Sequence, residues 1–389
     1  GAEIKKTRPA VVISSNLIGR LPINTNEELM NYLQKHRNYL AQNYSAWNKT
    51  FLFFSGGNES QYQQIKLIQD DVISTHIKVA PVGGIANHFY KTFNPTTNFG
   101  QYSNDFIRSV VDTGAIIISY LGHSGTQTWD NSIVDPIQIN NVIGRSSLVI
   151  DFGCSTGKFA EPDIKSFSEL ATLLFTGQPI AYIGNSALGF TSTAFSSPDV
   201  FFGKLAKDTI TNVSKLLNAT KMEMQRRMGS SDVNTVFALT STLIGDPILN
   251  ISIPKKPNLF ITRPHVRFDE DKLNDQVDSL EITAIISNLG LASKDTIDIN
   301  VKAINPKSQT IISIKRKVPP LADTLIFKLP IRDLSGQHVV TISLDNLDKV
   351  DEIYENDNIH EFSFLISSSR IKYLQNLSQS FSSINSSLR

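Results

Sequence analysis

The distribution of apolar residues changes character about two thirds of the way along the chain. Before residue 254, short continuous apolar runs alternate with segments whose apolar residues recur every three or four positions. Continuous runs are typical of strands that are buried on both faces, and the second spacing is typical of amphipathic helices. The alternation predicts an α/β domain with a mostly parallel sheet over residues 1–253.

Individual elements of this domain follow from the same pattern. Strands are predicted at residues 11–15, 51–54, 115–121, 148–150 and 180–183. Helices are predicted at residues 26–40, 65–72, 106–113, 168–176 and within 198–228. The first helix carries a capping-box signature, because Thr25 is followed three positions later by Glu28.

The pattern of apolar and polar residues becomes typical of an all-β protein after Pro254-Lys255-Lys256-Pro257. Apolar residues now alternate with period two, and residues 280, 282, 284 and 286 share one face of a strand, as do residues 297, 299 and 301. This pattern predicts an immunoglobulin-like β-sandwich over residues 254–368. Residues 369–389 are rich in serine and asparagine, as expected of a tail or linker.

The bulk properties exclude some classes of partner. A chain of 389 residues is long enough for two or three domains. Its formal net charge of +1 offers no basic surplus for nucleic acid. It contains no run of about 18 apolar residues, so no membrane-spanning segment is predicted. The first residues do not form a signal peptide, but a mature secreted chain would have lost one.

Two polar, glycine-rich loops follow predicted strands. Gly122-His123-Ser124-Gly125 follows the strand at 115–121, and Gly153-Cys154-Ser155 follows the strand at 148–150. The carboxyl ends of parallel strands meet at one edge of a sheet, so His123 and Cys154 are expected to lie near each other. An imidazole beside a thiol stabilises the thiolate, and small neighbours leave backbone N–H groups free for an oxyanion. Cys154 is the sole cysteine, which excludes an intrachain disulfide.

Other chemistries find less support. The remaining histidines are scattered, and a zinc site needs more ligands than they and one cysteine supply. No Walker-type glycine loop or Gly-x-Ser-x-Gly elbow occurs. Acidic residues are dense between Asp348 and Asp357, where a solvated loop is favoured over a structural Ca²⁺ site. No cofactor is therefore predicted.

Several blocks of sequence resemble one peptidase family. They are Ile18-Gly19-Arg20-Leu21-Pro22, residues 122–129, residues 151–159, residues 180–186 and Gly245-Asp246-Pro247-Ile248-Leu249. In this order they resemble the gingipain-type cysteine peptidases, family C25 of the caspase-like clan, over residues 8–253. The resemblance implies a caspase/gingipain-like α/β domain. Because the family's catalytic domain begins earlier, it also implies that an upstream subdomain is missing.

The resemblance assigns catalytic roles to named residues. It implies that Cys154 is the nucleophile and His123 the general acid/base. It implies an oxyanion hole made of the backbone N–H groups of Cys154 and of the residue after His123. That residue is Ser124 here, whereas the family usually has glycine. Ser124, like glycine, still provides a backbone N–H.

The same resemblance concerns substrate binding. Trp129, Asn185 and Ser186 resemble pocket walls of the family, and for Trp129 simple packing in the core is the alternative. Gln61 stands nearest to the acidic residue that gives basic-residue-specific gingipains their preference, so specificity for Arg or Lys is not expected. Ser55 stands where some members carry a carboxylate that orients the histidine.

The second domain adds an expectation about cellular context. Residues 350–358 resemble the strand-end signature of CARDB-type bacterial Ig-like modules. A C25 domain followed by such a module resembles the sortase-like branch that serves type IX secretion in Bacteroidetes-type bacteria. The resemblance implies a secreted or outer-membrane-associated, cell-surface protein. Its implied partners are protein or peptide substrates and components of the secretion system.

The sequence leaves three alternatives open. Hydrolysis and transpeptidation would use the same residues, so the pattern does not separate them. A catalytically degenerate, surface or secretion-associated binding protein with a peptidase fold is the alternative to an enzyme. The second domain is interpreted as a spacer, with binding of carbohydrate or an adhesin as the alternative.

Overall fold

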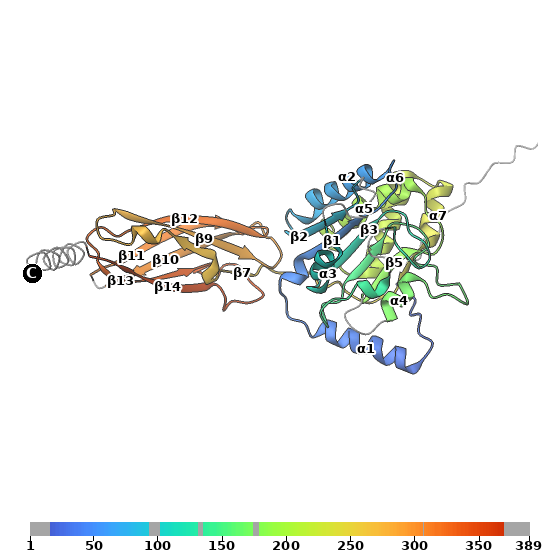
Figure 1. Ribbon diagram of the computed structural model, residues 1–389, viewed down its shortest axis with the longest axis horizontal. Coiled ribbons are helices and arrows are strands. Elements are labelled where there is room, and N and C mark those ends of the chain that lie inside the picture. The colour runs from blue at the N-terminus through green and yellow to red at the C-terminus, as the bar shows by residue number, and fades with distance from the viewer. Residues whose placement is uncertain (1–15, 93–101, 131–134, 174–178, 306, 369–389) are drawn as a thin grey trace, which may run out of the picture. The chain divides into compact units, whose positions relative to one another are not determined.

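The chain divides into two compact units, Gly1–Pro254 and Lys255–Arg389 (Figure 1). The computed structural model describes residues 16–92, 102–130, 135–173, 179–305 and 307–368. Each unit has hydrophobic core clusters made of its own residues. The strand predicted at 11–15 and the tail at 369–389 lie outside the described residues, as does the end of the helix predicted at 168–176.

The first unit is built on a six-stranded sheet with the order β2-β1-β3-β4-β5-β6. Its strands are β1 (Thr50–Ser55), β2 (Ile85–Tyr90), β3 (Ile117–Leu121), β4 (Leu148–Asp151), β5 (Ala181–Asn185) and β6 (Ser241–Ile244). The first five are parallel to their neighbours and β6 is antiparallel to β5. The carboxyl ends of β1 to β5 therefore share one edge, as the apolar runs predicted.

Helices cover both faces of this sheet (Figure 1). They are α1 (Asn26–Leu40), α2 (Tyr62–Val72), α3 (Asn104–Asp112), α4 (Phe167–Leu173), α5 (Thr191–Ala206), α6 (Val213–Met228) and α7 (Asp232–Thr240). Alternate residues of β1 point to opposite faces. Phe51 and Phe53 join the cluster that contains residues of α2, α5 and α6, whereas Leu52 and Phe54 join residues of α3 and α4. A strand buried on both faces reads as a continuous apolar run.

The capping box predicted at the first helix is present. The Thr25 side chain accepts a hydrogen bond from the Glu28 backbone N–H at 3.1 Å, and the Glu28 carboxylate accepts one from the Thr25 N–H at 3.2 Å. The segment 198–228, predicted to be helical, consists of two helices. α5 ends at Ala206, and Asn212 caps the start of α6 by accepting a hydrogen bond from the Lys215 N–H at 2.9 Å.

The second unit is a sandwich of antiparallel sheets. Its strands are β7 (Leu259–Phe260), β8 (Val266–Phe268), β9 (Ser279–Asn288), β10 (Thr296–Ile304), β11 (Gln309–Lys317), β12 (Ala322–Pro330), β13 (Gly336–Ser343) and β14 (Ile359–Ile366). One sheet has the order β11-β10-β13-β14, and the other has the order β12-β9-β7, with β8 also paired to β9. The alternating apolar residues of β9 and β10 are buried between the sheets, which confirms the predicted sandwich.

Acidic residues of the second unit stabilise the loop before β14. Glu352 is buried and accepts hydrogen bonds from the Leu259 N–H and from the Asn358 side chain. Burial raises its pKa to about 7. Asp345 accepts hydrogen bonds from the backbone N–H groups of Lys349 and Val350. Among the described residues, no three His, Cys, Asp or Glu side chains gather as a metal site.

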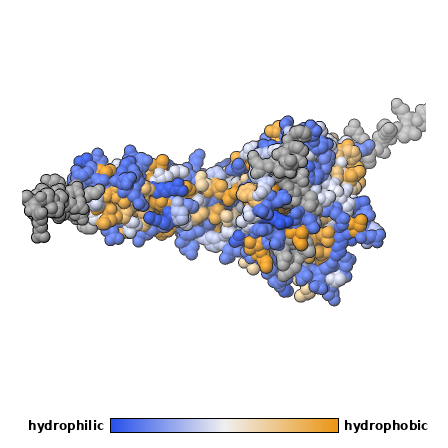
Figure 2. Space-filling view, in the orientation of Figure 1, coloured by the Kyte–Doolittle hydropathy of each residue, from blue (hydrophilic) through white to orange (hydrophobic). Residues whose placement is uncertain are grey.

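The surface of each unit carries both hydrophilic and hydrophobic residues. On the face drawn in Figure 2, hydrophilic and hydrophobic residues are interspersed over both units. Within the described ranges, no helix is both long enough and apolar enough to cross a membrane.

Candidate active site

His123 and Cys154 lie in loops at the ends of neighbouring strands. β3 and β4 are paired in parallel, with Tyr120 opposite Asp151. His123 follows the end of β3 by two positions, and Cys154 follows the end of β4 by three. Both residues line one cavity of about 90 Å³. The sheet therefore brings together the two residues that the sequence predicted to form a dyad.

Gln61 holds the imidazole of His123. The His123 Nε2 lies 2.7 Å from the Gln61 Oε1, which is an acceptor, so this nitrogen carries the proton of the bond. The other ring nitrogen, Nδ1, is then left to exchange a proton with a thiol. Gln61 directly precedes α2 and lines the same cavity. Gln61, which the sequence predicted to bind substrate, thus contacts the imidazole directly, a role that the sequence did not reveal.

The thiol of Cys154 is half-buried and has a backbone partner. The Gly189 N–H donates a hydrogen bond to Sγ at 3.3 Å. A donor at this position stabilises negative charge on sulfur. The cysteine loop is fixed to the loop after β5, because the Ser155 N–H donates to the Ala187 carbonyl oxygen at 3.0 Å. Ser155 has a φ of 58°, which turns the chain sharply after the cysteine.

Ser124 bonds to the backbone of the cysteine. Its Oγ accepts from the Cys154 N–H at 2.7 Å and donates to the Cys154 carbonyl oxygen at 2.8 Å. A Cβ on Gly153 would lie 2.2 Å from this Oγ, so only glycine fits beside it. Of the two predicted oxyanion donors, the Cys154 N–H is thus engaged by a side chain. The Ser124 N–H makes no backbone hydrogen bond within the described residues.

Asp151 anchors the cysteine loop from inside the protein. Its carboxylate accepts hydrogen bonds from the Gly153 N–H at 2.6 Å, from Thr156 Oγ1 at 2.6 Å, and from Trp129 Nε1 and the Tyr182 hydroxyl at 3.0 and 3.1 Å. Burial raises its pKa to about 6, although these donors act in the opposite direction. An acidic residue at the end of an apolar strand was the available signal, and the sequence interpretation missed it.

Trp129 packs in the core and does not line the cavity, so the alternative of core packing holds and the pocket-wall role does not. Only 1% of its surface is exposed. Its ring stacks between Tyr120 and Phe167, with centroid separations of 4.4 and 5.1 Å. The indole N–H donates to Asp151, so the buried ring supports the His123 and Cys154 loops from the core.

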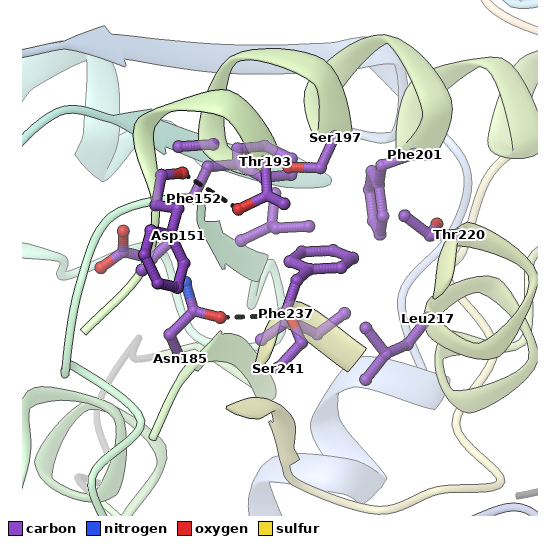
Figure 3. Close-up of a pocket in the computed structure, with 15 residues that line it drawn as sticks. Asp151, Phe152, Asn185, Thr193, Ser197, Phe201, Leu217, Thr220, Phe237 and Ser241 are labelled. Carbon is purple, nitrogen blue, oxygen red and sulfur yellow. Dashed lines mark hydrogen bonds between the residues drawn. The ribbon is translucent and has the colours of Figure 1, made fainter. Parts of the chain in front are cut away.

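Asn185 and Ser186 also lie outside the cavity that His123 and Cys154 share. Asn185 is buried and donates to the Gly153 carbonyl oxygen at 2.6 Å. Its side-chain oxygen accepts from Ser241 Oγ at 3.3 Å (Figure 3). The backbone N–H of Ser186 donates to the Thr240 carbonyl oxygen. Asn185 therefore supports the cysteine loop and lines the neighbouring cavity drawn in Figure 3, and the Ser186 backbone is fixed to Thr240.

Ser55 belongs to a separate hydrogen-bond chain. Its Oγ lies 2.8 Å from His88 Nε2, and His88 Nδ1 lies 2.9 Å from the Asp70 carboxylate. Ser55 has no exposed surface, and burial lowers the pKa of His88. The chain joins β1, β2 and α2. It does not contact His123, whose partner is Gln61 instead of a carboxylate.

The fold and the site together define a class of protein. A mostly parallel sheet that presents a histidine and a cysteine at the ends of adjacent strands is the arrangement expected of a caspase-like cysteine peptidase. The model of Peptidase family C25 matches residues 14–252. The chain therefore belongs to peptidase family C25, a family of cysteine peptidases.

Three solved structures are similar to the chain at low sequence identity. The Arg-specific cysteine proteinase gingipain R (RgpB) is 15% identical, with 92% of this chain and 77% of that chain covered and a TM-score of 0.49. The complex of Porphyromonas gingivalis RgpB pro- and mature domains is 15% identical, with 91% of this chain and 78% of that chain covered and a TM-score of 0.49. The CARDB domain of the Pyrococcus furiosus PF1109 protein is 19% identical over 30% of this chain and 92% of that chain, with a TM-score of 0.21. A comparison with curated proteins gave no match.

Replacing Gln61 should reveal its hold on His123. Gln61→Ala is expected to lower kcat/KM about tenfold, because the imidazole loses the partner that orients it. Gln61→Glu is expected to restore most of the activity, since its carboxylate can accept the same hydrogen bond from His123 Nε2. Gln64→Ala, at an exposed position of α2, is the control. Parent-like kcat/KM in Gln61→Ala would rule out this positioning role.

Proposed function

We propose that the protein is an endopeptidase that uses Cys154 as nucleophile and His123 as general acid/base. The observation that supports this most strongly is the shared cavity, in which the thiol is held by the Gly189 N–H and the imidazole by Gln61. Family C25 membership supports cysteine peptidase chemistry.

The reaction runs in two halves. His123 accepts the thiol proton, and Sγ attacks the peptide carbonyl carbon to form a tetrahedral intermediate. The C–N bond breaks, the leaving amine takes the proton from His123, and a thioester remains on Cys154. Water or an amine then attacks the thioester, which releases an acid or a new amide and returns the proton to sulfur.

The cavity favours an uncharged substrate side chain beside the cleaved bond. Ile65, Phe152, Ala194 and Phe195 supply apolar walls. No Asp, Glu, Lys or Arg lies among the described residues that line it. A guanidinium or carboxylate entering this space would lose water without gaining an opposite charge. We therefore propose peptides with an apolar residue on the amino side of the cleaved bond.

A substrate series tests this preference. Fluorogenic peptides that differ only at this residue should give a kcat/KM for Leu or Met at least about tenfold above that for Arg or Asp. Thr191→Asp adds a carboxylate to the cavity wall and is expected to raise the rate on the Arg peptide. Preference of the parent protein for Arg would contradict the proposed specificity.

We further propose that the enzyme acts as a sortase-like transpeptidase in type IX secretion, at the cell surface. The proposal is supported by the order of the two units, a C25 domain followed by a β-sandwich similar to CARDB domains. Incubation with a cleaved peptide and a peptide amine should yield the joined product by mass spectrometry. Release of the free acid alone, at millimolar amine, would favour hydrolysis.

The second candidate is a degenerate peptidase that binds proteins in secretion or at the surface. One observation favours it, the engagement of the Cys154 N–H by Ser124. A peptide-library screen of the full chain separates the two. No cleavage, together with a thiol that does not react near neutral pH, would select the binding protein.

A further inference from the structure

The hydroxyl of Ser124 occupies both backbone polar groups of the nucleophile residue. Its Oγ lies 2.7 Å from the Cys154 nitrogen and 2.8 Å from the Cys154 oxygen, and it acts as acceptor in the first bond and donor in the second. The Oγ sits in space that Gly153 leaves open by lacking a Cβ. The arrangement therefore depends on a serine and a glycine in two different loops.

Peptide-bond cleavage requires the Cys154 N–H for another purpose. As the thiolate attacks, the carbonyl oxygen becomes an oxyanion, and donors must lie within about 3 Å of it. An N–H group adjacent to the attacking sulfur is a suitable donor. Here the Ser124 Oγ lies where that N–H points, so the oxyanion and the hydroxyl compete for one hydrogen bond.

The Ser124 bonds are not required to hold the loop. The Gly153 N–H is bound by Asp151 and the Gly153 carbonyl oxygen by Asn185. The Phe152 N–H donates to the Tyr120 carbonyl oxygen, and the Ser155 N–H to that of Ala187. Four bonds from other residues thus fix the backbone on both sides of Cys154, and a variant without the hydroxyl is expected to fold.

We infer that Ser124 is an autoinhibitory latch, whose hydroxyl closes the oxyanion-binding N–H of Cys154 until substrate displaces it. The inference rests on the proposed peptidase function of the same site. Rotation of the Ser124 side chain breaks two hydrogen bonds before the N–H becomes available. Removing the hydroxyl should therefore increase the fraction of protein that is competent to bind an oxyanion.

The single cysteine allows a test of the latch that does not depend on activity. Labelling the full chain with ¹⁵N-cysteine yields one backbone amide signal, that of Cys154. In Ser124→Gly and Ser124→Ala, this amide is expected to exchange with solvent at least about tenfold faster than in the parent. Ser124→Thr, which keeps a hydroxyl, should retain the protection. Thr128→Ala serves as the control, because it removes from the same loop a hydroxyl that donates to the Trp129 carbonyl oxygen.

Two reagents for the thiol then separate the latch from a general effect on the site. A peptide aldehyde forms an oxyanion on binding, so its inhibition constant should fall about tenfold in Ser124→Gly, with a similar gain in kcat/KM. Iodoacetamide reacts at a saturated carbon and forms no oxyanion, so its rate should stay within about twofold.

Equal protection of the Cys154 amide in the parent and Ser124→Gly would overturn the latch. Weaker or unchanged aldehyde binding in Ser124→Gly would do so as well. If the Cys154 amide exchanges faster in Ser124→Gly but neither protein cleaves a peptide, the hydrogen bond from this N–H to Ser124 is supported. The proposed peptidase function is then contradicted.

Discussion

Cys154→Ala should reduce kcat/KM for any cleaved peptide by at least about 10⁴-fold, because the thiol is the nucleophile of the proposed mechanism. The thiol is half-buried, and its removal breaks the bond from the Gly189 N–H but leaves the backbone–backbone bonds of the loop intact, so the fold should persist. The loss should therefore appear in kcat with an unchanged thermal unfolding curve.

The matched control for this variant is Ser155→Ala, which keeps the thiol and changes the next side chain. It should retain most of the activity. Since Cys154 is the only cysteine, labelling by iodoacetamide should disappear altogether in Cys154→Ala and persist in the control. Cleavage by Cys154→Ala at more than about one hundredth of the parent rate would exclude the thioester mechanism.

Asp151→Ala is expected to lower the free energy of unfolding by about 3 kcal/mol and kcat/KM by more than about 100-fold. The variant removes the buried acceptor of the Gly153 N–H and the Thr156 hydroxyl, and leaves the Trp129 N–H with the Tyr182 hydroxyl alone. Cys154 would then lose its place beside His123. Denaturant unfolding and the rate on a fluorogenic peptide measure the two effects.

The raised pKa of Asp151 determines how the stability difference between the parent and Asp151→Ala changes with pH. Burial raises the Asp151 pKa from 3.8 to about 6. A carboxyl with a raised pKa in the folded state contributes stability that is fully present below its unfolded pKa and declines as the pH rises through the folded value. The difference in unfolding free energy between the parent and Asp151→Ala should therefore increase as the pH is lowered from 7 to 4.

An exposed acid nearby provides the comparison. Asp163→Ala, in the same connection between β4 and α4, should change neither stability nor rate. If Asp151→Ala behaves like Asp163→Ala, the buried carboxylate is not the anchor of the loop.

The central strands were predictable because they are buried on both faces. β1, β3, β4 and β5 read as continuous apolar runs, and their parallel order places His123 and Cys154 at one edge. β2 and β6 lie at the edges of the sheet and were missed. β2 is largely half-buried, so its sequence lacks a continuous apolar run.

Side-chain roles at the site were harder to predict because they depend on distant elements. Gln61 and His123 are separated by 62 positions and meet only because α2 begins beside the end of β3. Trp129 lies in a polar loop of the sequence, yet it returns to the core to bond Asp151. In the second unit, the apolar residues that recur at every second position were sufficient to predict the sandwich, because one face of each strand packs on a single shared core.

The most direct test of a Cys154 nucleophile is capture of the thioester. The full chain is mixed with a cleaved peptide, quenched in acid within the first turnover, digested and mapped by mass spectrometry. The acyl portion of the substrate should be found on the peptide that contains Cys154, and on no peptide of Cys154→Ala. Product formation without this adduct, at equal rates in the parent and Cys154→Ala, would contradict the mechanism.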